Sequence, residues 1–123
     1  GCTAENGEEI LRKMFAMDEG ASMLGELALV PKESPINRSG RLFYNTLFDE
    51  NACCHVAVGK GFGEVLDGFT EMSQEELTAR GINDSLIHVD FMVGSEDLSV
   101  TGYREDGSSV AIFRDGTWAF PVE

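Results

Sequence analysis

Residues 86–93 read LIHVDFMV, and this stretch decides the class of fold. It is apolar except for His88 and Asp90, and its β-branched and aromatic residues are typical of a strand. Side chains two positions apart point to the same face of a strand, so His88 and Asp90 share one face. The stretch therefore predicts a strand that holds an imidazole and a carboxylate side by side among apolar neighbours.

Downstream of this strand, the chain is predicted to continue as hairpins. Short strands are expected over residues 97–103, 109–113 and 117–122. The turns between them contain Asp-Gly pairs, which are among the strongest signals for a tight hairpin turn. These pairs are Asp106-Gly107 and Asp115-Gly116. This end of the chain is therefore expected to be antiparallel.

Two further strands and two helices are expected upstream. The strands cover residues 25–30, GELALV, and residues 52–59, ACCHVAVG. One helix covers residues 7–19, where apolar residues recur at helical spacing. The other opens at Ser73 with the capping box Ser-Gln-Glu-Glu and runs to about Arg80. Helices early and antiparallel strands late predict an α+β fold, with a short N-terminal helix, one further helix and a mixed, largely antiparallel sheet.

The remaining segments are less regular. Residues 31–40 contain two prolines, two serines and a glycine, which predicts a loop. Residues 41–50, RLFYNTLFDE, could form a helix or a short buried segment. Several glycines in residues 59–68 predict a flexible loop. The length of 123 residues is typical of one domain, and residues 1–123 are expected to form a single domain.

The composition narrows the possible partners and compartment. A formal net charge of -13 repels the phosphates of nucleic acids and of anionic lipids, so neither a nucleic acid nor a membrane is expected as a partner. No apolar run approaches the roughly 20 residues that cross a bilayer. Three cysteines, two of them adjacent, do not suggest a disulfide framework, and no secretory leader is recognisable, which favours a cytoplasmic location. Because the chain starts without Met, we expect a processed product or a fragment.

The pair formed by His88 and Asp90 has two interpretations. A buried carboxylate without a partner is costly, and a divalent ion would remove that cost. Histidine and aspartate are ordinary ligands of zinc, cobalt and manganese. Alternatively, the two side chains form a hydrogen-bonded pair on a half-exposed sheet face. Their spacing in the sequence leaves both interpretations open.

Other polar residues in apolar stretches are equally ambiguous. His55 in ACCHVAVG could be a ligand or a satisfied core residue, and Glu26 in LGELALVP could be a ligand or an exposed charge at a strand edge. Cys53 and Cys54 are not expected to bind metal, because adjacent side chains point to opposite faces of a strand. Nothing in the spacing alone joins these residues into one site.

Three blocks of the sequence resemble the C-terminal signature blocks of the thermophilic metallo-aminopeptidase family, of the aminopeptidase T and aminopeptidase II type. They are LGELALVP at residues 24–31, GRLFYNTLFDENACCHVAVGKGF at residues 40–62 and INDSLIHVDFMVGSEDL at residues 82–98. The resemblance runs from about Glu8 to the end of the chain, and the order and spacing of the blocks are specific. It implies that residues 1–123 are the C-terminal metal-binding part of a larger aminopeptidase.

The resemblance also implies a site and a reaction. Two divalent ions, of zinc, cobalt or manganese, would be held by Glu26, His55, His88 and Asp90, with Glu26 as a bridging ligand. A water activated by the metals would hydrolyse the N-terminal residue from a peptide substrate. A homodimer, formed largely through this part of the chain, is implied as well.

Two departures from the family pattern stand out. A further glutamate ligand and a whole N-terminal domain lie upstream of the residues present here. Phe62 occupies the position of a tyrosine that is thought to assist catalysis in the family. Since phenylalanine has no hydroxyl to donate a hydrogen bond or move a proton, no catalytic residue is assigned.

Three functions are possible for this chain. The first is that it forms part of a metal-dependent aminopeptidase and is weak or inactive by itself. Alternatively, it is a non-catalytic metal-binding or dimerisation module. The third possibility is a structural α+β domain without metal, in which protein partners satisfy all four polar residues.

Overall fold

The computed structural model describes residues 2–122, which form two compact units. The first unit comprises the residues up to Leu27 together with Val56–Phe91. The second comprises Ala28–His55 together with the residues from Met92 onward. The expectation that residues 1–123 form a single domain stays a prediction.

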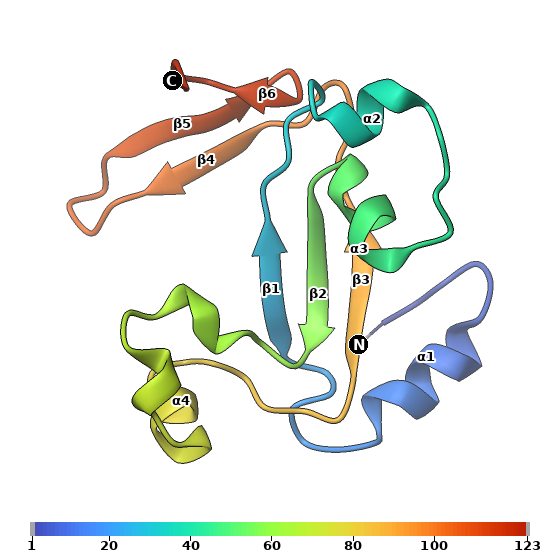
Figure 1. The fold of residues 1–123 in the computed structure, drawn as a ribbon, viewed down its shortest axis with the longest axis vertical. Coiled ribbons are helices and arrows are strands. Elements are labelled where there is room, and N and C mark those ends of the chain that lie inside the picture. Colours follow the sequence, from blue (N-terminus) through green and yellow to red (C-terminus); the bar gives the residue numbers. More distant parts are fainter. Residues whose placement is uncertain (1, 123) are drawn as a thin grey trace. The chain divides into compact units, whose positions relative to one another are not determined.

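A three-stranded sheet forms the centre of the first unit. Its strands lie in the order β1 (Leu24–Ala28), β2 (His55–Gly59) and β3 (His88–Met92), and their last or first residues Ala28, His55 and Met92 belong to the second unit (Figure 1). The N–H of Gly59 donates to the carbonyl of Met23, and the N–H of Lys60 donates to that of Ile87. Because the end of β2 thus meets the start of both neighbours, the sheet is antiparallel.

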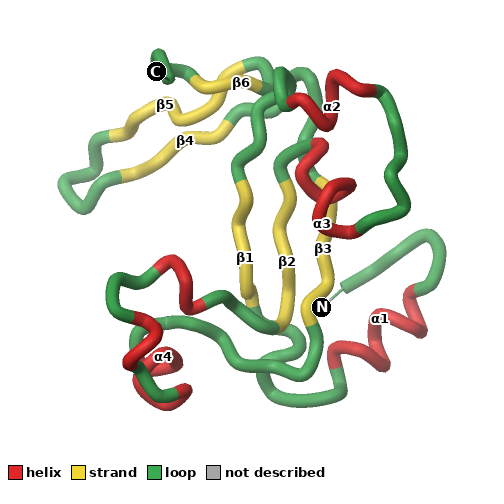
Figure 2. Tube along the Cα trace, in the orientation of Figure 1, coloured by secondary structure: helices red, strands yellow, loops and turns green. Residues whose placement is uncertain are grey.

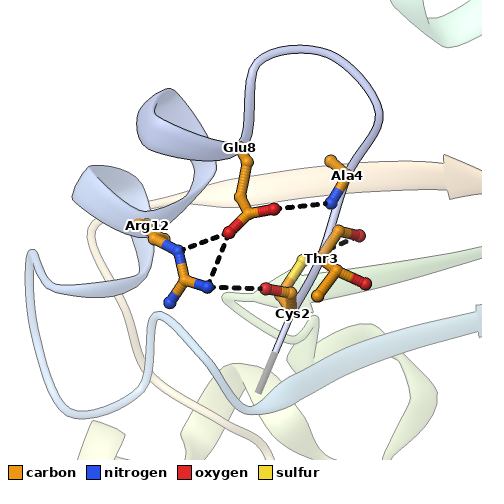
Figure 3. Close-up of polar contacts among 5 residues, drawn as sticks. All are labelled: Cys2, Thr3, Ala4, Glu8 and Arg12. Atoms are coloured by element: carbon orange, nitrogen blue, oxygen red, sulfur yellow. Dashed lines mark hydrogen bonds and ion pairs between the residues drawn. The ribbon is translucent and has the colours of Figure 1, made fainter.

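The N-terminal helix α1 (Glu8–Phe15) holds the preceding segment by polar contacts (Figure 3). Arg12 donates to Glu8 Oε1 at 2.8 and 2.6 Å, and Glu8 Oε2 accepts from the N–H of Ala4. Arg12 also donates to the carbonyl of Cys2 at 3.3 Å. The Arg12 guanidinium is the main cause that lowers the pKa of Glu8. An exposed pair of this kind contributes little stability, so its effect is to orient the segment.

The second helix of this unit, α4 (Gln74–Ala79), begins where the sequence predicted it. Ser73 Oγ accepts from the N–H of Glu76, and the Glu76 carboxylate accepts from the N–H of Ser73 at 2.7 Å, which completes the capping box. Gly81 follows with φ of 95°, a conformation that favours glycine after a helix. Two short 3₁₀ turns, Gly63–Val65 and Phe69–Glu71, lead from β2 to this helix.

The second unit contains the hairpins predicted at the end of the chain. Strands β4 (Val100–Tyr103), β5 (Ser109–Arg114) and β6 (Thr117–Trp118) form an antiparallel sheet in that order (Figure 2). Both Asp115 and Gly116 have positive φ, of 51° and 73°, as a tight turn between twisted strands requires. Phe113 is fully buried, and its ring meets that of Trp118 edge-on at 4.5 Å.

Two short helices precede this sheet within the second unit. Helix α2 (Pro35–Ser39) lies in the segment that was predicted to be a loop, so that prediction is wrong. Pro35 takes the first helical position, where its missing N–H costs nothing, and Gly40 ends the helix with φ of 59°. Helix α3 (Thr46–Asp49) continues into the 3₁₀ turn Glu50–Ala52 and is exposed, which excludes the buried alternative for residues 41–50.

The α+β class is confirmed, but the arrangement differs in two respects. The strands are divided between two sheets of three, where one sheet was expected. The described residues form four α-helices, where two were expected. No helix in the range 2–122 is long and apolar enough to cross a membrane.

Candidate metal centre

Three of the four predicted ligands come together in the first unit. Glu26 lies in the middle of β1, while His88 and Asp90 lie on β3. His88 Nε2 is 3.5 Å from Glu26 Oε2 and 3.4 Å from Asp90 Oδ1. All three side chains are largely buried, with exposed fractions of 24%, 26% and 15% for His88, Glu26 and Asp90. The two carboxylates therefore converge on one ring nitrogen.

The other nitrogen of His88 is engaged by the main chain. Nδ1 lies 2.7 Å from the carbonyl oxygen of Lys60. A carbonyl oxygen can only accept, so this contact places a hydrogen on Nδ1. In the neutral imidazole, Nε2 then carries a lone pair and faces two carboxylate oxygens. Two carboxylate oxygens this close to an acceptor nitrogen are favourable only when a cation, either a proton or a metal ion, lies between them.

The buried carboxylate oxygen of Asp90 is the strongest indication of a cation-binding site here. This atom, Oδ1, is buried and has no hydrogen-bond partner among the described residues. An unsatisfied buried carboxylate oxygen is costly in free energy. A divalent ion between Asp90 and His88 would remove this cost, and nitrogen and oxygen donors suit zinc, cobalt and manganese.

The distances from His88 Nε2 to the two carboxylates are those of neighbouring ligands in a metal site. Ligands about 2.1 Å from a tetrahedral ion lie roughly 3.4 Å from each other. The two separations at His88 Nε2 therefore match those of neighbouring ligands. Nevertheless, no group of three or more His, Cys, Asp or Glu side chains in the described part of the chain is arranged to hold a metal ion as it stands. What is present is two pairwise contacts that meet at one nitrogen.

His55, the fourth predicted ligand, belongs to the second unit. It is 2% exposed, and its Nδ1 lies 3.0 Å from the carbonyl of Cys53. The thiol of Cys54 exchanges hydrogen bonds with the main chain of Val30, accepting from its N–H at 3.2 Å and donating to its carbonyl at 3.3 Å. Cys54 thus occupies an interior position with its thiol satisfied by protein groups.

Phe62, the residue at the family's tyrosine position, lies against His88. The ring centroids are 4.9 Å apart with an interplanar angle of 55°, and Phe62 is 45% exposed. The aromatic ring therefore covers part of the imidazole while keeping one side toward solvent. It supplies apolar contact to His88 and no polar group.

Sequence reasoning missed the main-chain carbonyl of Lys60, because a carbonyl has no side-chain signature. Glycines offer the only signal. A Cβ at Gly25 would lie 2.6 Å from the Lys60 oxygen and overlap the Gly59 carbonyl, and a Cβ at Gly59 would overlap the Ile87 carbonyl. Gly59 also has φ of 95°. The backbone at residues 59–60 therefore runs close against both neighbouring strands, and this brings the Lys60 carbonyl to His88.

The chain is similar to several known proteins. The chain is 52% identical to Aminopeptidase 2 of Geobacillus stearothermophilus over 120 residues, which are 98% of this chain and 29% of the relative. It is 50% identical to Aminopeptidase T of Thermus thermophilus over 94% of this chain and 28% of the relative. The solved structure of wild-type AmpT from Thermus thermophilus matches with a TM-score of 0.82 and 48% identity, over 95% of this chain and 28% of that one.

The chain thus spans less than a third of the length of these relatives. The family described as Thermophilic metalloprotease (M29) matches residues 1–118, nearly the whole sequence. Because the structural match to AmpT is accompanied by 48% sequence identity, it reflects common descent. The chain belongs to the thermophilic metalloprotease (M29) family.

Proposed function

We propose that this chain is the C-terminal part of a metal-dependent aminopeptidase, which removes N-terminal residues from peptides. The observation that carries the proposal is the convergence of Glu26 and Asp90 on His88 Nε2, with Asp90 Oδ1 buried and lacking a hydrogen-bond partner among the described residues. The relatives named above are aminopeptidases, which gives the reaction. A buried set of acceptors is what a hydrolytic metal site needs.

In this proposal, Glu26, His55, His88 and Asp90 hold divalent ions, two in the complete site. Zinc, cobalt and manganese all suit this donor set, which contains no thiolate. When bound, such ions supply Lewis-acid activation of water and of the peptide carbonyl. The chain's own residues orient the site: the Lys60 carbonyl keeps a proton on His88 Nδ1, and Phe62 shields one part of the imidazole ring.

The whole protein is proposed to act on peptides in the cytoplasm as a homodimer. Neither nucleic acids nor membranes are proposed as partners, since the net charge of -13 opposes both. The same negative charge favours cations, including the charged amino group of a peptide. Because the chain spans less than a third of its relatives, we propose that alone it has weak activity or none.

A direct test measures hydrolysis of amino-acid p-nitroanilides by the full-length protein that carries this sequence. Activity should disappear after dialysis against a chelator and return with zinc, cobalt or manganese. Glu26→Gln should remove the activity that the metal restores. Glu33→Gln is the matched control, because the Glu33 carboxylate accepts from Thr117 within the second unit and is not a proposed ligand. Activity that survives chelation and Glu26→Gln would overturn the proposal.

A non-catalytic metal-binding or dimerisation module is the second candidate, and Phe62 favours it. Its ring lies beside His88 but offers no hydroxyl for proton transfer. Phe62→Tyr in the full-length protein would place a hydroxyl on that ring. We predict that it raises kcat, while Phe62→Leu leaves kcat unchanged or lower. Metal binding without any peptidase activity, in both the native protein and Phe62→Tyr, would favour the non-catalytic module.

A further inference from the structure

Asn83 joins three segments of the first unit. Its side-chain Nδ2 donates to the carbonyl of Gly59 at 2.6 Å and to that of Gly20 at 2.9 Å. Its main-chain carbonyl accepts from the N–H of Gly61 at 2.8 Å. Both hydrogens of the amide are thus used, and each goes to a different segment. Asn83, in the loop before β3, therefore holds the end of β2 with its side chain and the loop that follows β2 with its main-chain carbonyl.

Lys60 is the residue that these contacts enclose. Asn83 holds Gly59 and Gly61, the residues on either side of it, and the Lys60 N–H donates to Ile87 at 2.7 Å. The main-chain carbonyl of Lys60, which shares its peptide unit with the N–H of Gly61, meets His88 Nδ1 at 2.7 Å. The orientation of that carbonyl therefore depends on the hydrogen bonds made by its two neighbours.

We propose that Asn83 is a positioning residue for His88, which acts through the Lys60 carbonyl. By fixing that carbonyl, Asn83 keeps the hydrogen of the neutral imidazole on Nδ1 and leaves Nε2 as the donor that faces Glu26 and Asp90. Partners that orient a ligating histidine are as much part of a metal site as the ligand itself. The inference rests on the proposed function, because it takes His88 as a metal ligand.

The tautomer of His88 gives a readout that a merely structural role of Asn83 would not move. The chain contains only two histidines, so nitrogen NMR of the 123-residue chain labelled at histidine shows two imidazoles, and His88→Gln identifies the signals of His88. The spectra are recorded without metal, at a pH where both rings are neutral. Cobalt affinity of the same samples is measured by calorimetry.

Asn83→Ala removes both side-chain donors without adding a new charge, and it keeps the main-chain bond to Gly61, so it tests the hold of the side chain on Gly59. We expect the Nε2–H tautomer of His88 to appear beside the Nδ1–H form, and cobalt affinity to fall about tenfold, the lower end for a residue that supports a ligand. Asn37→Ala is the matched control. The Asn37 amide also donates to a carbonyl, that of Lys32 at 2.8 Å, but it lies in the second unit. It should change neither the tautomer nor the affinity.

Two results would overturn the positioning role. One is an Nε2–H tautomer of His88 in the unmutated chain. This result would exclude the positioning role even if Asn83→Ala fails to fold. The other is a folded Asn83→Ala chain with an unchanged tautomer and unchanged affinity. Cobalt binding by that variant at native strength would leave the proposed function standing. An Nδ1–H tautomer that depends on Asn83 in a chain that binds no cobalt would keep the positioning role and remove the metal site.

Discussion

The two ring nitrogens of His88 make different contacts. Nδ1 of the imidazole meets a carbonyl oxygen, while Nε2 meets the carboxylates of Glu26 and Asp90. Burial of Asp90 Oδ1 without a hydrogen-bond partner in the described chain is unfavourable for the metal-free fold. Such residues lower the stability of the metal-free fold and gain their stabilising partner only when the ligand binds. The Asp90 carboxylate should therefore destabilise the metal-free fold and strengthen metal binding.

We therefore predict that Asp90→Asn weakens metal binding but does not weaken the metal-free fold. The amide could donate to His88 Nε2, so the free energy of unfolding in the presence of a chelator should stay equal or rise by about 1 kcal/mol. Urea unfolding with and without zinc measures both effects. Asp97→Asn is the control, because the Asp97 carboxylate already accepts from Ser95. A large loss of metal-free stability in Asp90→Asn would contradict the account.

Asp18 provides a pH-dependent prediction. Its Oδ2 accepts from the N–H of Leu86 at 2.8 Å and from the Ser85 hydroxyl at 3.1 Å, and the Leu86 bond is the main cause that lowers the pKa of Asp18 below its ordinary value. A depressed folded-state pKa contributes stability that is present above the unfolded-state value and disappears as pH falls through the folded-state value. The native chain should exceed Asp18→Asn in stability at neutral pH.

The check is a series of urea unfolding curves between pH 7 and pH 2. The advantage of the native chain over Asp18→Asn should stay level down to about pH 5 and shrink below pH 4. An advantage that grows as the pH falls would have the wrong sign. Equal stability at pH 7 would show that the charge on Asp18 contributes nothing.

At the scale of elements, the close approach of β1, β2 and β3 places the Lys60 carbonyl. Gly59 has positive φ, and a Cβ there would overlap the Ile87 carbonyl. We predict that Gly59→Ala destabilises the chain by about 2–4 kcal/mol, from the unfavourable φ and from the steric overlap together. Loss of metal affinity should accompany it, because the carbonyl would be displaced from His88.

Gly68→Ala separates the two causes. Gly68 also has positive φ, of 75°, but nothing lies within 4 Å of a Cβ placed there. Its cost should be about 1 kcal/mol, from the backbone conformation alone, with metal affinity unchanged. Thermal and urea unfolding compare the two variants directly. Equal losses of stability would mean that the contact with Ile87 does not constrain the strand.

The elements also show what a sequence can predict. The strand at β3, the capping box of α4 and the Asp115-Gly116 turn follow from local chemistry, and each was predicted. The sequence does not predict helix α2, because proline and glycine are also typical of loops, whereas here they mark the start and end of a short helix. The approach of Glu26 to His88 follows from the resemblance and not from spacing, since strand pairing between distant segments has no local signature.

At the scale of the whole molecule, the chain spans less than a third of its relatives, and its residues fall into two compact units. Three proposed ligands lie in the first unit, and His55 lies in the second. The part of the site that this chain carries in one unit is Glu26, His88 and Asp90.

The measurement that tests this account most directly is a calorimetric titration of the metal-free 123-residue chain with zinc and cobalt, beside the double variant His88→Ala, Asp90→Ala. We predict saturable binding by the native chain, with little or none by the double variant, while Asn37→Ala binds as the native chain does. No binding by the native chain, or equal binding by the double variant, would contradict the claim that Glu26, His88 and Asp90 bind a metal ion in this chain.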